Sequence, residues 1–187
     1  MILTFMRFTE SRNIKLTNIK SRINQTMKTL YLVRHAKSSW KHDVDDHKRP
    51  LKGRGEKDGQ LVSKKVSKEI EPPQRIISSD ATRAFSTAQF FKEALNISDE
   101  NFETNHDLYD FSGQHVMRII KSLDDDLDTV MIVGHNHAFT SVVNMLGNRY
   151  IENVPTCGFV MLQFDEKKWS NITTGKTVKT IFPRDLK

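Results

Sequence analysis

The chain has 187 residues, of which 37% are hydrophobic and 28% are charged, and its formal net charge is +6 with histidine neutral. This length and composition predict one globular domain with its own core and exclude a disordered chain. The single cysteine, Cys157, excludes an intramolecular disulfide and a paired-cysteine zinc or redox site, so we expect a reducing, cytoplasmic location. No apolar run approaches the ~18 residues of a membrane helix, and we expect no membrane partner.

Most of the excess positive charge belongs to the first 26 residues. They hold five basic side chains and one acidic one, which leaves 24 basic and 22 acidic side chains for residues 27–187. Because this leader is polar and aperiodic, we expect residues 1–26 to be a disordered arm before a domain over 27–187. A basic targeting segment, and a native start at Met27, remain open alternatives. With the domain nearly neutral, the charge gives little support to a nucleic-acid partner.

From residue 28 onward, strands and helices are predicted to alternate. In chain order, the predictions are a strand over 29–33, a helix over 51–70, a strand over 75–77, helices over 81–95 and 116–123, a strand over 129–133, a helix over 139–146, and strands over 158–164 and 169–182. We expect Asp80 or Ser79 to cap the second helix, its Phe85 to Phe91 stripe to lie in the core, and Gly147 to cap the last helix. The alternation indicates an α/β domain, a three-layer α/β/α sandwich with a mostly parallel central sheet.

Histidine and arginine side chains follow three of the predicted strands. The first strand runs into Arg34-His35, the strand over 75–77 leads to Arg83 on the next helix, and the strand over 129–133 leads to His135. Because parallel sheets place ligands at the carboxyl ends of their strands, we expect these four side chains to meet in one pocket. Two arginines require an oxygen-rich anion such as a phosphoryl group, and a neutral imidazole can attack phosphorus. This chemistry needs no metal and no cofactor.

Three blocks in the right order resemble the histidine phosphatase superfamily. They are Leu32-Val33-Arg34-His35-Ala36-Lys37, the segment 78–88 with its Arg83, and Val133-Gly134-His135-Asn136. Arg49-Pro50-Leu51 followed by Arg54-Gly55 also matches the small members of the family. The compact size and the Arg-His-Ala-Lys-Ser-Ser-Trp sequence are most similar to the SixA-type phosphohistidine phosphatases. The resemblance implies a phosphoglycerate mutase-like fold.

The resemblance also implies a role for each of the four residues. His35 is the nucleophile that forms a phosphohistidine intermediate, Arg34 and Arg83 hold the phosphoryl oxygens, and His135 donates to them. The implied partner is a phosphorylated protein, carrying phosphohistidine, or a small phosphate-containing substrate. Departures from the larger members are Ala36 where they have glycine and Lys41 where they often have asparagine.

An acidic proton donor, which larger members carry, has no recognisable motif in this chain. Asp107 and Asp110 are the nearest candidates. An ester substrate leaves as an alkoxide that needs a proton, whereas phosphohistidine leaves as imidazole, so the missing acid favours phosphohistidine. Two alternatives stay open: a small-molecule phosphomonoesterase that uses one of these acids, and a phospho-binding module without turnover.

The remaining chemistry-bearing residues are expected to be structural. His135 and His137 form a His-x-His pair, but they straddle a strand-to-helix turn, so we expect no metal there. Ser38 and Asn136 are possible phosphate contacts, and Cys157 is expected to be a small buried residue. Loop or surface positions are expected for the other histidines: His42, His47, His106 and His115.

Overall fold

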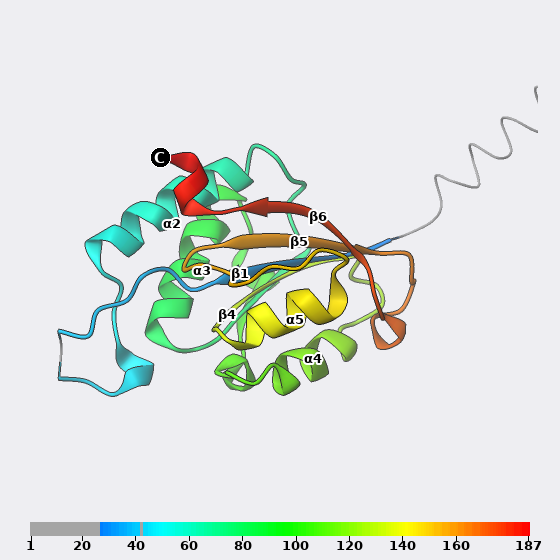
Figure 1. Cartoon of the computed structure of the whole chain (residues 1–187), viewed down its shortest axis with the longest axis horizontal. Helices are drawn as coiled ribbons and strands as arrows, with labels where there is room; N and C mark the ends of the chain where they lie inside the picture. The colour runs from blue at the N-terminus through cyan, green and yellow to red at the C-terminus, as the bar shows by residue number, and fades with distance from the viewer. Residues whose placement is uncertain (1–26, 42) are drawn as a thin grey trace, which may run out of the picture.

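The structure, a computed structural model, describes residues 27–41 and 43–187 (Figure 1). The predictions for the leader over 1–26 and for His42 lie outside the described residues. The elements are β1 (Lys28–Arg34), α2 (Gly53–Val66), β2 (Arg75–Ser78), α3 (Thr82–Ala94), β3 (Phe102–Thr104), α4 (Gln114–Lys121), β4 (Thr129–Gly134), α5 (Ala138–Leu146), β5 (Phe159–Phe164) and β6 (Lys176–Ile181). Short 3-10 turns join them, among them η1 (Asp46–Lys48), η3 (His106–Leu108) and η4 (Trp169–Asn171).

The six strands form one sheet in the order β3-β2-β4-β1-β5-β6. The four strands from β3 to β1 are mutually parallel, whereas β5 runs antiparallel to β1 and β6 antiparallel to β5. The prediction of a mostly parallel sheet is therefore confirmed. The strands β2, β4 and β1 are direct neighbours, so their carboxyl ends lie side by side at one edge.

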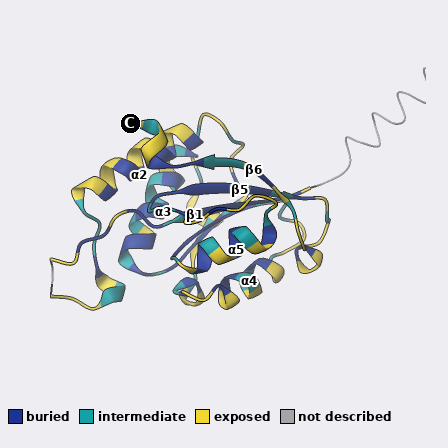
Figure 2. Cartoon of the chain, in the orientation of Figure 1, coloured by how far each residue is buried: buried dark blue, intermediate teal, exposed yellow. Residues whose placement is uncertain are grey.

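Helices cover both faces of the sheet, as a three-layer sandwich requires (Figure 1). Along β1, Leu30 and Leu32 pack into the core cluster that includes residues of α4 and α5, while Tyr31 and Val33 pack into the cluster with residues of α2 and α3. Successive strand side chains point to opposite faces, so a strand covered on both sides reads as a continuous apolar run. Figure 2 shows the central strands buried between these layers. None of the helices described is long and apolar enough to cross a membrane.

Three details of the sheet and helices differ from the predictions. The edge strand β3 was not predicted, because it has only three residues and two of them are exposed. The last predicted strand is shorter, since Trp169 lies in the turn η4, buried, with its indole N–H donated to Leu127 O at 2.7 Å. Phe91 is buried as expected, but Phe85 is 39% exposed and packs edge-on against Phe102.

The predicted cap of one helix is wrong, and the predicted cap of another is confirmed. The N-cap of α3 is Ala81, which makes no side-chain cap, and not Asp80 or Ser79. The Asp80 carboxylate is bonded to two histidines instead, and Ser79 Oγ contacts His135. Gly147 is the C-cap of α5, as predicted, and its backbone N–H donates to Val143 O at 2.9 Å, with a φ of −95° that is not left-handed. Its lack of a side chain is needed for space, since a Cβ there would lie 2.3 Å from Thr177 Oγ1.

Candidate active site

The four residues predicted to form a site do come together at the carboxyl edge of the sheet. His35 follows β1, and its backbone N–H donates to Gly134 O of β4 at 2.9 Å. Arg83 Nε lies 3.3 Å from His35 Nε2, and the His35 and His135 ring centroids are 5.1 Å apart. Arg34 Nη1 donates to Val154 O at 2.7 Å, which holds that guanidinium beside the same edge.

An open pocket of about 490 Å³ lies over this edge. Its walls are Arg34, His35, Lys37, Ser38, Trp40, Asp46, Arg49, Arg83, Tyr109, Phe111, Asn136 and Thr156. The volume suits a phosphorylated side chain, and the walls carry four cationic side chains. His135 is not a wall residue: it is fully buried, with Tyr109 and Phe111 at ring-centroid distances of 5.1 and 5.5 Å.

Hydrogen bonds fix the protonation state of His35. Its Nδ1 lies 2.8 Å from Ala36 O, an acceptor, so Nδ1 carries the proton and Nε2 keeps a lone pair. Arg83 Nε donates to that Nε2. Burial, together with the charges of Arg83, Arg34 and Arg49, outweighs the Ala36 bond, which raises the pKa of His35, and brings that pKa to about 3. The result is a neutral imidazole whose Nε2 lone pair faces Arg83 and carries no proton at neutral pH.

His135 is also held neutral. Its Nε2 lies 2.9 Å from Ser79 Oγ, and its Nδ1 has no hydrogen-bond partner among the described residues. Burial lowers the pKa of His135 to about 2, and the neighbouring His35 and Arg83 act in the same direction. The unpaired Nδ1 is uncommon for a buried polar atom, because leaving such an atom unsatisfied costs roughly 1–3 kcal/mol.

Asp46 is a central residue of the pocket that the sequence did not single out. Its Oδ2 accepts from Arg83 Nη2 at 2.9 Å and from the Tyr109 hydroxyl, and its Oδ1 accepts from Arg49 Nε at 2.8 Å. Burial raises the pKa of Asp46, but these hydrogen bonds and the two arginine charges outweigh it and bring the pKa to about 2. One signal was available, namely the three-residue spacing of Asp46 and Arg49.

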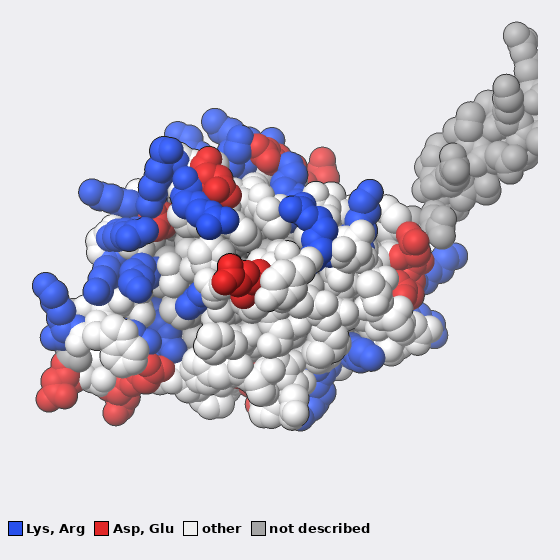
Figure 3. Space-filling view, in the orientation of Figure 1, with Lys and Arg blue, Asp and Glu red and all other residues white. Residues whose placement is uncertain are grey.

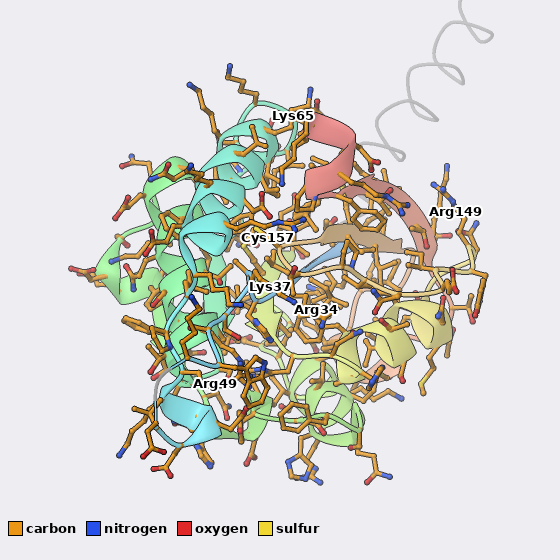
Figure 4. The ribbon with its side chains drawn as sticks, turned by 60° about the vertical axis from the view of Figure 1, so that its left-hand side comes forward. Arg34, Lys37, Arg49, Lys65, Arg149 and Cys157 are labelled. Carbon is orange, nitrogen blue, oxygen red and sulfur yellow. The ribbon has the colours of Figure 1, made fainter. Side chains whose placement is uncertain are left out.

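Arg49, quoted only as part of the family resemblance, also faces the pocket. Its guanidinium stacks over the Trp40 ring at 3.5 Å, and its Nη1 donates to Ser38 Oγ at 2.8 Å. Figure 4 shows Arg34 and Lys37 close together near the centre, with Arg49 of the same pocket below them and Arg149 apart from them at the right-hand edge. The loop after β1 therefore adds a third arginine and a lysine to the predicted pair of arginines.

Neither candidate acid, Asp107 or Asp110, lines the pocket. Asp110 is buried, and its carboxylate accepts the N–H groups of Ser112, Gly113, His115 and Val116 at the start of α4. Burial raises the pKa of Asp110, but these bonds outweigh it and leave the pKa below its usual value. The residue is thus an ionised cap of α4, and as a proton donor it was a wrong candidate. Asp107 is exposed, 4.0 Å from His115.

The other sequence candidates divide between the pocket and the scaffold. Ser38 and Asn136 line the pocket. Cys157 is buried, as predicted, and its backbone N–H donates to the carbonyls of Arg34 and His35 at 3.0 and 3.2 Å. His137 is exposed and does not pair with His135. Within the described residues, the side chains spaced to hold a metal ion are a separate set, His47, Asp80 and His106.

The fold and the pocket together define a class of protein. A neutral, hydrogen-bonded histidine among three arginines, at the strand ends of an α/β sandwich, is a site built for phosphoryl groups. Residues 30–114 match the family model described as histidine phosphatase superfamily (branch 1). The chain belongs to this superfamily.

The chain is also similar to a curated relative and to solved structures with the same fold. An uncharacterised chloroplastic protein of Arabidopsis thaliana is 32% identical over 149 residues, 75% of this chain and 68% of that protein. A structure of protein histidine phosphatase SixA complexed with tungstate superimposes with a TM-score of 0.71 at 18% identity, covering 85% of this chain and 99% of that one. The structure of SixA from Agrobacterium tumefaciens superimposes with a TM-score of 0.70 at 23% identity. The match covers 83% of this chain and 98% of that one. A phosphoglycerate mutase from Bacillus anthracis superimposes with a TM-score of 0.59 at 15% identity, over 81% of this chain and 92% of that one. The predicted phosphoglycerate mutase-like fold is therefore confirmed.

Proposed function

We propose that this protein is a phosphatase that removes the phosphoryl group from phosphohistidine on a protein partner, with His35 as the nucleophile. The observation that carries the proposal is the hydrogen bond from the Nδ1 proton of His35 to Ala36 O. It leaves the Nε2 of His35 without a proton, at the pocket wall beside Arg83. An imidazole held in this tautomer is ready to attack phosphorus without first losing a proton.

The two chemical steps need only these residues and water. His35 Nε2 forms a bond to phosphorus while the bond to the substrate imidazole breaks, and that imidazole takes a proton from water. A water molecule then attacks the phosphorylated His35, releases inorganic phosphate and restores the neutral histidine. Arg83, Arg34 and Arg49 offset the negative charge of the equatorial oxygens in both transition states.

Two buried polar atoms support the binding of an anion here. His135 Nδ1 and Arg34 Nε have no hydrogen-bond partner among the described residues, although Arg34 lines the pocket and the His135 ring lies 5.1 Å from that of His35. Phosphoryl oxygens would satisfy the Arg34 Nε–H, and His135 would donate once it carries a proton on Nδ1. The tungstate complex of SixA is a precedent for a phosphate-like oxyanion on this fold.

The surface supports a protein substrate over a small one. The pocket is open, and its rim carries the exposed side chains Lys37, Trp40 and Phe111. Figure 3 shows that Lys and Arg side chains predominate on the surface over α2. The start of α2 packs against Lys37, in the loop between β1 and α2. Basic side chains around an open pocket favour an acidic phosphorylated surface, because complementary charge speeds association.

The test is to trap the intermediate and compare substrates. Wild type incubated with a ³²P-phosphohistidine protein should acquire an acid-labile label, and His35→Ala should acquire none. His115→Ala is the matched control, since His115 is an exposed histidine outside the pocket. Equal labelling of His35→Ala and wild type would overturn the mechanism. Turnover of alkyl phosphates at the rate of phosphohistidine would overturn the substrate class in favour of a phosphomonoesterase. Binding of the phosphorylated protein with neither labelling nor turnover would point to a binding module.

A further inference from the structure

A cluster of two histidines and one carboxylate lies outside the pocket described above. His47 Nε2 lies 2.8 Å from Asp80 Oδ1, and His106 Nδ1 lies 2.8 Å from Asp80 Oδ2. One ligand atom from each of the three residues falls within 4.8 Å of the others. None of the three is needed for the phosphoryl-transfer steps proposed above.

We propose that His47, Asp80 and His106 form a binding site for a divalent transition-metal ion of the zinc type. Two imidazole nitrogens and one carboxylate oxygen are a donor set that Zn²⁺ takes, with water as the fourth ligand of a tetrahedron. With bonds of ~2.1 Å, tetrahedral ligand atoms stand roughly 3.4 Å apart. The present separations are within a side-chain adjustment of that arrangement.

The backbone holds the three ligands from three separate segments. His47 lies in η1, where Lys48 N donates to Asp45 O at 2.9 Å, and His106 lies in η3, where Tyr109 N donates to His106 O at 2.8 Å. Asp80 directly follows Ser79, whose N–H donates to Val133 O of β4 at 2.9 Å. Because the backbone is fixed at each position, an ion would need little additional ordering to bind.

The cluster is also open to an ion arriving from solvent. The exposed fractions of the side chains are 33% for His47, 35% for Asp80 and 73% for His106, which leaves room for a water ligand. Imidazole donors disfavour Mg²⁺ and Ca²⁺, which prefer sets made of oxygen. The site is therefore expected to distinguish Zn²⁺ from Mg²⁺.

Isothermal titration of the full chain with Zn²⁺, after treatment with a chelator, tests the site. Wild type should bind Zn²⁺, Mg²⁺ should give no binding, and His47→Gln and His106→Gln should each weaken the affinity for Zn²⁺ at least tenfold. His115→Gln is the control, an exposed histidine close to an acidic residue but outside the cluster, and it should bind as wild type does. Added Zn²⁺ should raise the thermal unfolding midpoint of wild type and of His115→Gln, and not that of His106→Gln.

Two results would overturn the site: wild type that binds no Zn²⁺, or His47→Gln and His106→Gln variants that bind it as tightly as wild type. Thermal unfolding in chelator checks that each variant is folded, which is expected because the replaced side chains are partly or largely exposed. The outcome is independent of the proposed phosphatase activity, since the titration measures neither His35 nor turnover.

Discussion

Gly55 gives the sharpest test of how the pocket is built. The residue lies in the first turn of α2, and a Cβ placed on it would stand 2.2 Å from the carbonyl oxygen of Lys37. That oxygen also accepts the N–H of Lys52 at 2.8 Å, so the start of α2 rests directly on the loop that follows His35. An alanine at this position must push the Lys37 backbone away by about 1 Å to reach an ordinary contact distance.

The expected cost of Gly55→Ala follows from two opposing effects. A methyl group inside a helix stabilises it by up to ~1 kcal/mol relative to glycine, whereas overpacking against backbone costs ~1–3 kcal/mol. The free energy of unfolding should therefore fall by roughly 0–2 kcal/mol. The effect on activity should be larger, because a misplacement of about 1 Å near the reacting atoms lowers the rate by roughly 10- to 100-fold.

Gly53→Ala is the matched control for Gly55→Ala. Gly53 begins the same helix, and a Cβ there would meet nothing within 4 Å. Its stability should be unchanged or higher by up to ~1 kcal/mol, with unchanged activity. Urea unfolding and turnover of a phosphohistidine peptide measure the two quantities. If Gly55→Ala matched Gly53→Ala in both, the contact between α2 and the Lys37 backbone could not be what positions His35.

Three further outcomes follow from the contacts of the site. Asp46→Asn should lower kcat about tenfold, because Arg83 loses its ionic partner. The free energy of unfolding should fall by only ~1 kcal/mol, since Asp46 is 38% exposed. Steady-state kinetics measures kcat, and urea unfolding measures stability. Asp110→Asn should lower the free energy of unfolding by ~1–2 kcal/mol through loss of the α4 cap. It should leave the ratio of ester to phosphohistidine turnover unchanged. Asp107→Asn should change neither the free energy of unfolding nor that ratio. The folded-state pKa of His35, about 3, lies below its unfolded value of 6.5, so its contribution to stability is present above pH 6.5 and is lost as pH falls toward 3. Between pH 6.5 and 5.0, wild type should therefore lose about 1.5 kcal/mol more than His35→Gln in urea unfolding, and equal losses would contradict a neutral His35.

The sequence predicted the site residues whose positions are set by the ends of the sheet strands. Apolar runs such as 29–33 and 129–133 are readable as buried strands, and parallel strands bring their carboxyl ends together. Arg34 ends β1, His35 and His135 directly follow β1 and β4, and Arg83 is the second residue of α3. Their meeting is therefore a consequence of topology: the hydrophobic pattern predicts the strands, and the parallel sheet brings their carboxyl ends together.

The parts that the sequence did not predict depend on side-chain contacts between loops. The loop between β1 and α2 has no periodicity, and its shape comes from Arg49 stacking on Trp40 and from the bridge between Ser38 and Leu51. Asp46 reaches Arg83 only because of that shape. The same holds for His47, whose partners Asp80 and His106 come from segments 33 and 59 residues away along the chain.

The protonation states of the pocket give a reason for the proposed phosphohistidine substrate. Among the described residues that line the pocket, Asp46 is the only carboxylate. It has a pKa of about 2 and accepts from the Tyr109 hydroxyl, whose pKa burial and Asp46 together raise. Neither group is placed to give up a proton at neutral pH as a carboxylic acid would. Turnover should therefore follow the stability of the leaving group, with phosphohistidine and p-nitrophenyl phosphate cleaved much faster than glycerol phosphate. Steady-state rates on the three substrates at pH 7 measure this order. Comparable rates on glycerol phosphate would require a proton donor within the pocket and would count against the reasoning.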